Sequence, residues 1–280
     1  MSQTWLLQAT GAELAAEVSA REYNRLLQLP RDRELEGDLK ERADAARAWY
    51  AQYGKPFVAV RRIPLESVGR ASLPANLDQP DSTAGTEARP TNETDESTVN
   101  AGGVTLHSLV LARRLQAGEA HALMLLAASA GTEIAAEAAR LWTDGRPDEG
   151  YFLDRFAVAV TERLIFWASA TLCRASEAAH ETLLPHLSPG CGNWDIADQH
   201  RLWSLLAGGA STLGPMRILE TGALDPQHSV LAAMGVTRKN VASSPEHLCR
   251  SCDLARCAFR RAPFAAACAP GRWLDTVNPL

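Results

Sequence analysis

The chain has 280 residues, 46% of them apolar, and a formal net charge of -5. This apolar fraction is sufficient for a folded core, and the acidic balance argues against nucleic acid as a main partner. No stretch reaches the ~18 consecutive apolar residues that a membrane span requires. The first residues also lack the charged start and apolar run of a signal peptide. We therefore expect a cytoplasmic protein that binds neither nucleic acid nor a membrane.

The first part of the chain, residues 1–72, is predicted to hold helices followed by a strand. Residues 11–53 carry apolar side chains at helical spacing, with an interruption at Pro30. A Gly-Lys-Pro sequence then stops the helical pattern, and the β-branched content of residues 57–63 indicates a strand. This part is expected to belong to the same domain as the core that follows.

Residues 73–103 differ in composition from the rest of the chain. Proline, aspartate, threonine, glutamate, asparagine and glycine dominate there, and aromatic residues are absent. Such a segment cannot bury enough apolar surface to offset the entropy lost on ordering. We therefore predict a flexible acidic loop between the N-terminal part and the core.

Residues 104–245 are predicted to form the main part of the core. A helix is expected over 106–115, and the apolar run 121–128 is typical of a strand buried on both faces. Thr132 is a candidate N-cap for the next helix. The clearest helix follows residue 150, because large apolar residues recur on one face: Phe152, Phe156, Val160, Leu164 and Trp167.

The end of this core is predicted to contain turns, a helix and two strands. Residues 188–194 form a turn, and Asp195 could cap a helix that ends at Gly208. Residues 216–221 are expected to pair with a strand over 230–236. The order of elements predicts an α+β fold with a mixed or largely antiparallel sheet and flanking helices.

The segment from Ser188 to Met234 resembles a known family, the activation domain of cobalamin-dependent methionine synthase. It is most similar to bacterial proteins that carry this domain alone and end in a cysteine cluster. The resemblance rests on a Ser-Pro-Gly-Cys-Gly-Asn-Trp turn, a Leu-Glu-Thr strand and a Pro-x-x-Ser-Val sequence, which begin at Ser188, Leu219 and Pro226. It implies a curved sheet with flanking helices that binds S-adenosylmethionine in a shallow groove and docks on a cobalamin module.

By position, the resemblance assigns ligand-binding roles to five residues. Pro189 and Gly190 would supply backbone contacts, and Glu220 would meet the cationic amine of the ligand. His186 stands where the family has an arginine, and Cys191 where it has a tyrosine. Histidine cannot reproduce the two parallel hydrogen bonds of a guanidinium to a carboxylate.

The C-terminal segment, residues 246–280, holds a cluster of cysteines. Cys249, Cys252 and Cys257 have the spacing of metal ligands, and Cys268 is a candidate fourth ligand, with His247 and Cys191 as alternatives. The cluster is predicted to bind zinc or an iron–sulfur cluster. Reduced thiols without a metal, or thiols with a redox role, remain alternatives because a complete site needs a fourth ligand.

The resemblance implies that this chain acts with a corrinoid protein or corrinoid methyltransferase, in reductive reactivation or in support of methyl transfer. The chain lacks the Asp-x-His-x-x-Gly signature that binds cobalamin in this family. Cobalamin would therefore be held by the partner. Two alternatives stay open: a metal or iron–sulfur redox protein that uses the cysteine cluster, and a scaffold without catalytic function.

Overall fold

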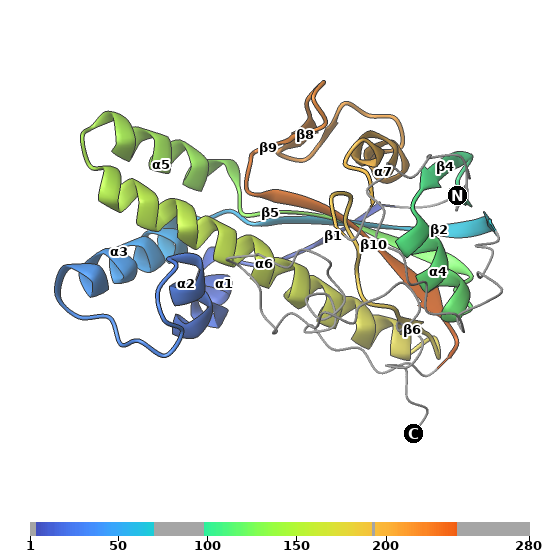
Figure 1. The fold of residues 1–280 in the computed structure, drawn as a ribbon, viewed down its shortest axis with the longest axis horizontal. Helices are drawn as coiled ribbons and strands as arrows, with labels where there is room; N and C mark the ends of the chain where they lie inside the picture. Colours follow the sequence, from blue (N-terminus) through green and yellow to red (C-terminus); the bar gives the residue numbers. More distant parts are fainter. Residues whose placement is uncertain (1–3, 70–97, 192–193, 240–280) are drawn as a thin grey trace, which may run out of the picture.

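The computed structural model describes residues 4–69, 98–191 and 194–239 (Figure 1). Its centre is a seven-stranded antiparallel sheet in the order β4-β3-β2-β5-β10-β6, with β1 paired to β2. The strands of this sheet are β1 (Thr4–Leu7), β2 (Phe57–Val68), β3 (Thr98–Ala101), β4 (Val104–His107), β5 (Ala122–Ser129), β6 (Thr182–Leu183) and β10 (Ser229–Thr237). A smaller sheet holds β7 (Thr212–Leu213), β8 (Met216–Ile218) and β9 (Leu224–Asp225).

Helices cover both faces of the large sheet (Figure 1). The described residues form α1 (Gly11–Glu17), α2 (Ala20–Leu26), α3 (Gly37–Tyr53), α4 (Leu109–Ala117), α5 (Thr132–Thr143), α6 (Pro147–Glu177) and α7 (Asp198–Ala207). One face of the sheet is covered by α1, α2, α3, α5 and α6, which we call the α6 layer. The other face is covered by α4 and α7, which we call the α4–α7 layer. The N-terminal helices and the later helix α6 thus share one core.

Side chains along the central strands point alternately to the two faces of the sheet, and this explains the three-layer arrangement. Met124 and Leu126 of β5 face the α6 layer, whereas Leu123 and Leu125 face the α4–α7 layer. Successive side chains of a strand point to opposite faces, so a strand that is apolar at every position needs a cover on both sides. Every residue of β5 is buried, which confirms the predicted buried strand.

Helix α6 is the longest element of the α6 layer, and the sequence explains both its start and its buried face. Pro147 stands in the first turn, where its missing N–H removes no hydrogen bond, and two acidic residues follow it. Phe156 and Val160 are fully buried on the face toward the sheet. Among the described helices, α6 alone is long and apolar enough to cross a membrane, but half of its apolar window is buried inside the protein.

Several predicted elements have other limits in the structure. The predicted helix over 106–115 begins only at Leu109, because residues 104–107 form β4 and Ser108 caps α4 by accepting a hydrogen bond from the amide of Leu111. Residues 73–97 of the predicted loop lie outside the described residues, and residues 98–101, expected to belong to it, pair with β2 and β4 as β3. The N-cap of α5 is Gly131 rather than Thr132.

The predicted pairing of strands 216–221 and 230–236 is wrong. Strand β8 ends at Ile218 and pairs with β7 and β9, whereas β10 lies between β5 and β6 in the large sheet. The residues of β10 from Leu231 onward are buried, and β10 pairs with β5 over eight positions in the centre of the large sheet. Its apolar pattern therefore reflects cover by helices on both faces and does not identify a neighbouring strand. Residues 222–226, expected to be the turn between these two strands, instead include β9 of the small sheet, and the chain enters β10 only at Ser229.

Candidate functional site

Two segments that carry most of the predicted ligand residues contact the N-terminal end of α7. Asp198 anchors this end of the helix: its side chain is 1% exposed, and Oδ2 accepts hydrogen bonds from Trp194 Nε1 at 2.8 Å and from the His107 amide at 2.6 Å. The other carboxylate oxygen bonds to Arg201. A buried carboxylate with this many donors is fully paired, and it fixes α7 to β4 and to the preceding loop.

The loop before α7 forms a tight turn. The Gly190 amide donates to the Trp194 carbonyl at 2.7 Å, and the Cys191 amide donates to the Ser188 carbonyl at 3.1 Å. Gly190 has φ +88, which L side chains adopt only with strain, and a Cβ there would lie 3.3 Å from the side chain of Ile196. The turn conformation therefore depends on glycine at this position.

A second turn, residues 219–223, is held against the next turn of α7. Gln199 Nε2 donates to the Gly222 carbonyl at 2.9 Å, and His200 Nε2 lies 3.3 Å from the Glu220 carbonyl oxygen. Both turns thus contact the same end of the helix. We call the exposed residues of this region the motif face: Gly190, Cys191, Ile196, Leu219 and Glu220.

Four of the five predicted ligand residues lie on the two segments that contact the N-terminal end of α7. Gly190, Cys191 and Glu220 are exposed, and Pro189 is buried. Glu220 was expected on a strand but lies in the turn after β8, because the strand ends at Ile218. Its exposed carboxylate can meet a cationic group without the cost of desolvating a buried charge.

His186 is placed apart from the motif face. Leu187 pairs with Ala233 at the edge of the sheet and points into the core beneath α7. The preceding residue therefore points toward the opposite face, where the His186 ring meets the ring of Phe166 of α6 edge-on, with centroids 5.9 Å apart. The His186 carbonyl is also within 3.5 Å of Arg114 Nη1.

The predicted metal ligands Cys249, Cys252, Cys257 and Cys268, together with His247, lie outside the described residues. Within the described ranges, no group of three or more His, Cys, Asp or Glu side chains is arranged to hold a metal ion. Cys191 is exposed, whereas Cys173 is half-buried on α6, and burial raises the pKa of its thiol. The metal prediction therefore continues to rest on the spacing of the C-terminal cysteines.

Two groups of acidic and basic residues, one pair and one set of three, were missed in the sequence. Asp154 Oδ1 lies 3.0 Å from His228 Nε2, and this hydrogen bond is the main cause of a lowered Asp154 pKa. Glu181 accepts two hydrogen bonds from Arg62, at 2.7 and 2.8 Å, and lies 2.9 Å from His121 Nε2. Partners that stand 60 to 119 positions apart give no local sequence signal.

The residues of the motif face match only part of S-adenosylmethionine. Gly190 provides a close backbone approach and Glu220 an acidic group for a cationic amine. No guanidinium stands at position 186, and the ring there is turned toward Phe166. The described residues of this face therefore lack the fork that would hold the ligand carboxylate, and we derive no chemical step from this ligand.

The comparisons with known proteins concern the fold. Neither a protein-family model nor a curated protein sequence matches the chain. Among solved structures, the chain is similar to the one titled "Crystal Structure of the MetH Reactivation Domain bound to AdoHcy", with 14% sequence identity and a TM-score of 0.54. The match covers 86% of this chain and 81% of that one. The fold predicted from the family resemblance is thereby confirmed: this chain has the fold of the MetH reactivation domain.

Proposed function

We propose that this protein is an accessory domain of the reactivation type, which acts with a corrinoid protein or corrinoid methyltransferase. The observation that carries the proposal is the likeness to the MetH reactivation domain over 86% of the chain. The placement of Gly190 and Glu220 together beside α7 supports it, since these residues carry the sequence resemblance. The cobalamin would be held by the partner.

The exposed apolar residues of the motif face support a docking role. Ile196 is 53% exposed and Leu219 is 38% exposed, on the two segments that carry the ligand motif. Large apolar side chains gathered at an exposed site are typical of a surface that another molecule covers. We propose that the corrinoid partner covers this surface and that S-adenosylmethionine, or a ligand of its class, binds at its edge.

The ligand part of the proposal is tested by calorimetric titration of AdoHcy into the wild type and into two matched variants. Gly190→Ala places a Cβ at a positive φ on the motif face, and Gly145→Ala does the same in the exposed turn between α5 and α6. Both changes strain the backbone by roughly 1–2 kcal/mol. We expect saturable binding to the wild type and to Gly145→Ala, and at least tenfold weaker binding to Gly190→Ala.

The variant His186→Arg tests, in the same titration, whether a guanidinium at this position strengthens AdoHcy binding. A guanidinium can hold a carboxylate by two parallel hydrogen bonds, so we expect this variant to bind AdoHcy more tightly than the wild type. Absence of binding by both proteins would contradict the ligand proposal and favour the scaffold alternative.

The partner proposal has its own readout. An inactive, oxidised corrinoid protein is mixed anaerobically with a reductant and S-adenosylmethionine, with and without this chain, and its cobalt is followed by absorbance. We expect the methylated form to appear faster in the presence of the chain. Equal rates would count against a reactivation role.

A further inference from the structure

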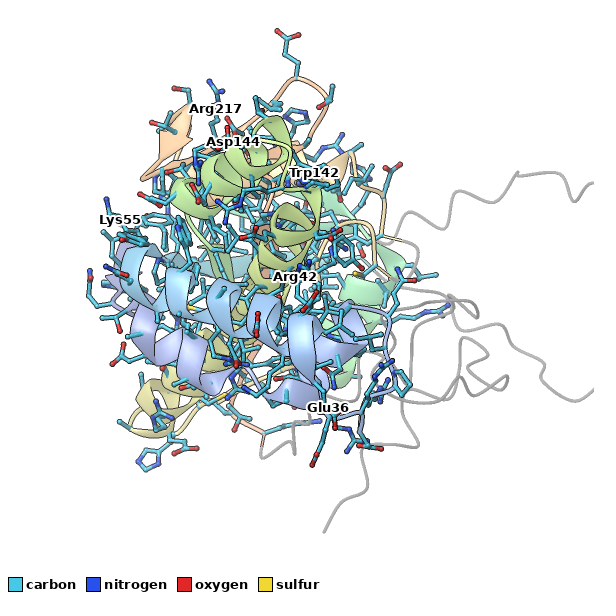
Figure 2. The ribbon with its side chains drawn as sticks, turned by 90° about the vertical axis from the view of Figure 1, so that its left-hand side faces the viewer. Glu36, Arg42, Lys55, Trp142, Asp144 and Arg217 are labelled. Atoms are coloured by element: carbon cyan, nitrogen blue, oxygen red, sulfur yellow. The ribbon has the colours of Figure 1, made fainter. Side chains whose placement is uncertain are left out.

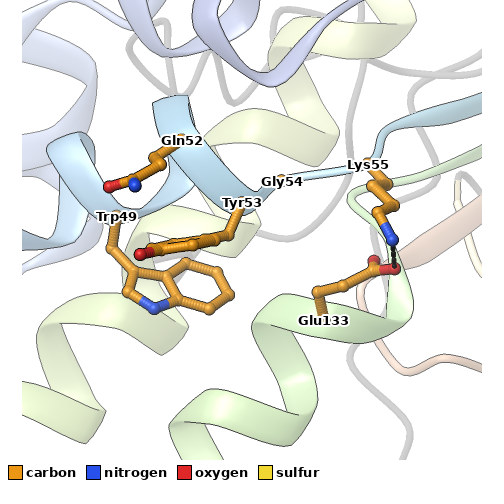
Figure 3. A pocket seen from close by; sticks show the side chains of 6 residues that line it. All are labelled: Trp49, Gln52, Tyr53, Gly54, Lys55 and Glu133. Carbon is orange, nitrogen blue, oxygen red and sulfur yellow. Dashed lines mark ion pairs between the residues drawn. The ribbon is translucent and has the colours of Figure 1, made fainter.

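A second candidate site lies between the C-terminal end of α3 and the N-terminal end of α5. It is a hollow of about 380 Å³, within the ~300–1,000 Å³ range of small-molecule sites. We call it the α3–α5 hollow; Figure 3 shows the residues that line it, which are Trp49, Gln52, Tyr53, Gly54, Lys55 and Glu133. None of them belongs to the motif face.

The walls of the α3–α5 hollow are held in place by the sheet. The Tyr50 hydroxyl donates to the Ala130 carbonyl at 2.8 Å, and this buried bond joins α3 to the segment that leads into α5. Gly131 has φ +104, and a Cβ there would lie 2.7 Å from the Lys55 carbonyl oxygen. The two backbone segments therefore touch only because residue 131 is a glycine, and the site is built on fixed elements.

One wall of the hollow is aromatic. Trp49 and Tyr53 stand four residues apart on α3, and their ring centroids lie 5.4 Å apart with the planes tilted by 46°. Tyr53 is 49% exposed, and both rings border the opening in Figure 3. Aromatic rings in this position offer a large apolar surface with little conformational entropy to lose when a ligand covers them.

The opposite wall carries one positive and one negative group. Lys55 Nζ lies 3.4 Å from Glu133 Oε1, which is longer than the ~2.7–2.9 Å of a well-formed charged hydrogen bond. The Lys55 side chain is 77% exposed and can swing without disturbing the fold. Figure 2 shows Lys55 just beyond the C-terminal end of α3, at the surface of the molecule. This wall has no net charge, and the Gln52 amide lies on the other side of the hollow, near Trp49 (Figure 3).

We propose that the α3–α5 hollow binds a small zwitterion with an apolar side chain, the class of the free apolar α-amino acids. The ligand ammonium would meet Glu133, its carboxylate would meet Lys55, and its side chain would cover Trp49 and Tyr53. A ligand with a single charge is attracted by one member of the ion pair and repelled by the other. A zwitterion is attracted by both, so it suits this wall better than a simple cation or anion.

The test is a titration of the full chain with L-phenylalanine, L-methionine and L-leucine, followed by ligand-detected NMR and calorimetry. We expect at least one of them to bind saturably. For L-phenylalanine, phenethylamine and 3-phenylpropionate each lack one of the two charges, and both should bind at least tenfold more weakly. Losing one charge-assisted hydrogen bond at a partly exposed site corresponds to about tenfold in affinity.

Two variants assign the binding to this site. Lys55→Met removes the cation and keeps the aliphatic stem. Lys40→Met is its matched control, because Lys40 is an exposed lysine of α3 that is also paired with a carboxylate. We expect Lys55→Met to weaken binding at least tenfold and Lys40→Met to leave it unchanged, with both proteins unfolding at the wild-type temperature. No saturable binding of any of the three amino acids at about 10 mM would overturn the proposal. So would equal affinities for the wild type and Lys55→Met.

Discussion

The two faces of the central sheet are covered in different ways. The α6 layer holds long helices, including 31 residues in α6 and 17 in α3, and its core is continuous and apolar. On the other face, α4 and α7 have 9 and 10 residues, and the strands β7 to β9 have two or three. The second face buries a smaller apolar cluster, and the hydrogen bonds of Asp198 additionally fix α7. The first face thus holds the larger part of the core, and the second carries the turns of the motif face.

The largest expected effect on stability comes from the core of the α6 layer. The Phe156 side chain is fully buried, and its ring lies 5.1 Å from the Tyr23 ring and 6.0 Å from the Tyr50 ring. We expect Phe156→Ala to lower the free energy of unfolding by about 3–5 kcal/mol, because it leaves a cavity among large side chains. Denaturant unfolding measures this, with Leu219→Ala on the motif face as control. A loss below about 1 kcal/mol would contradict a continuous core.

A smaller loss is expected from the anchor of the other face. Asp198→Ala leaves Trp194 Nε1 and the His107 amide without their buried acceptor. We expect the free energy of unfolding to fall by about 2–4 kcal/mol, since each unpaired buried donor costs about 1–3 kcal/mol. The exposed Asp195, which accepts a bond from the Ala197 amide, provides the control Asp195→Ala. Equal stabilities of the two variants would show that hydrogen bonding does not hold α7.

The contribution of Glu181 to the free energy of unfolding should depend on pH in the acid range. Hydrogen bonds from Arg62 are the main cause of the lowered pKa of Glu181, and His121 adds to it, while burial opposes it. The folded state therefore binds the Glu181 proton less readily than the unfolded state does. The resulting stability is present above the ordinary glutamate pKa near 4.5 and is lost as the pH falls through the folded value below it.

The variant Glu181→Gln tests the contribution of this carboxylate to stability. We expect it to cost about 1 kcal/mol at pH 7, because one charged acceptor of the Arg62 fork is lost. The variant should also lose less stability than the wild type between pH 5 and pH 3. If the two proteins lose the same amount of stability between pH 5 and pH 3, other carboxylates control acid unfolding.

Of these changes, a substitution in the cysteine cluster is expected to have the smallest effect on the free energy of unfolding of the core. If Cys249, Cys252 and Cys257 hold a metal, Cys252→Ser should abolish it, because three sulfurs provide no redundancy. We expect the unfolding of the core to change little, since the described residues already form an apolar cluster on each face of the large sheet. Metal content after anaerobic purification decides the matter. Less than about a tenth of an equivalent of zinc or iron in the wild type would contradict the metal prediction.

The difference between the two faces also explains what the sequence could predict. Periodicity revealed α6, because a long helix repeats its apolar spacing many times, and a continuous apolar run revealed β5. Strand β3 was missed: its four residues give no pattern of their own, and its pairing with β2 depends on tertiary contacts. The pairing of β10 was wrong because a strand buried on both faces does not identify its neighbours.

For the candidate site, the motif predicted more than periodicity could. It predicted that Gly190 and Glu220 face one ligand groove, and in the structure the segments of both residues contact the N-terminal end of α7. It also placed His186 at the edge of that site, whereas the ring contacts Phe166. The direction of one side chain beside a sheet edge depends on the register with β10, which the sequence does not encode locally. The α3–α5 hollow was missed for a related reason, since Lys55 and Glu133 are far apart in the chain.

The most direct test of the proposed function is amide hydrogen exchange with and without AdoHcy. We expect AdoHcy to slow exchange in residues 186–191 and 219–223, which include the two turns held against α7, and to leave exchange in α6 unchanged. The variant Gly190→Ala should reduce that protection, and Gly145→Ala should retain it. No protection in either turn, or protection confined to the α3–α5 hollow, would contradict the assignment of the ligand to the motif face.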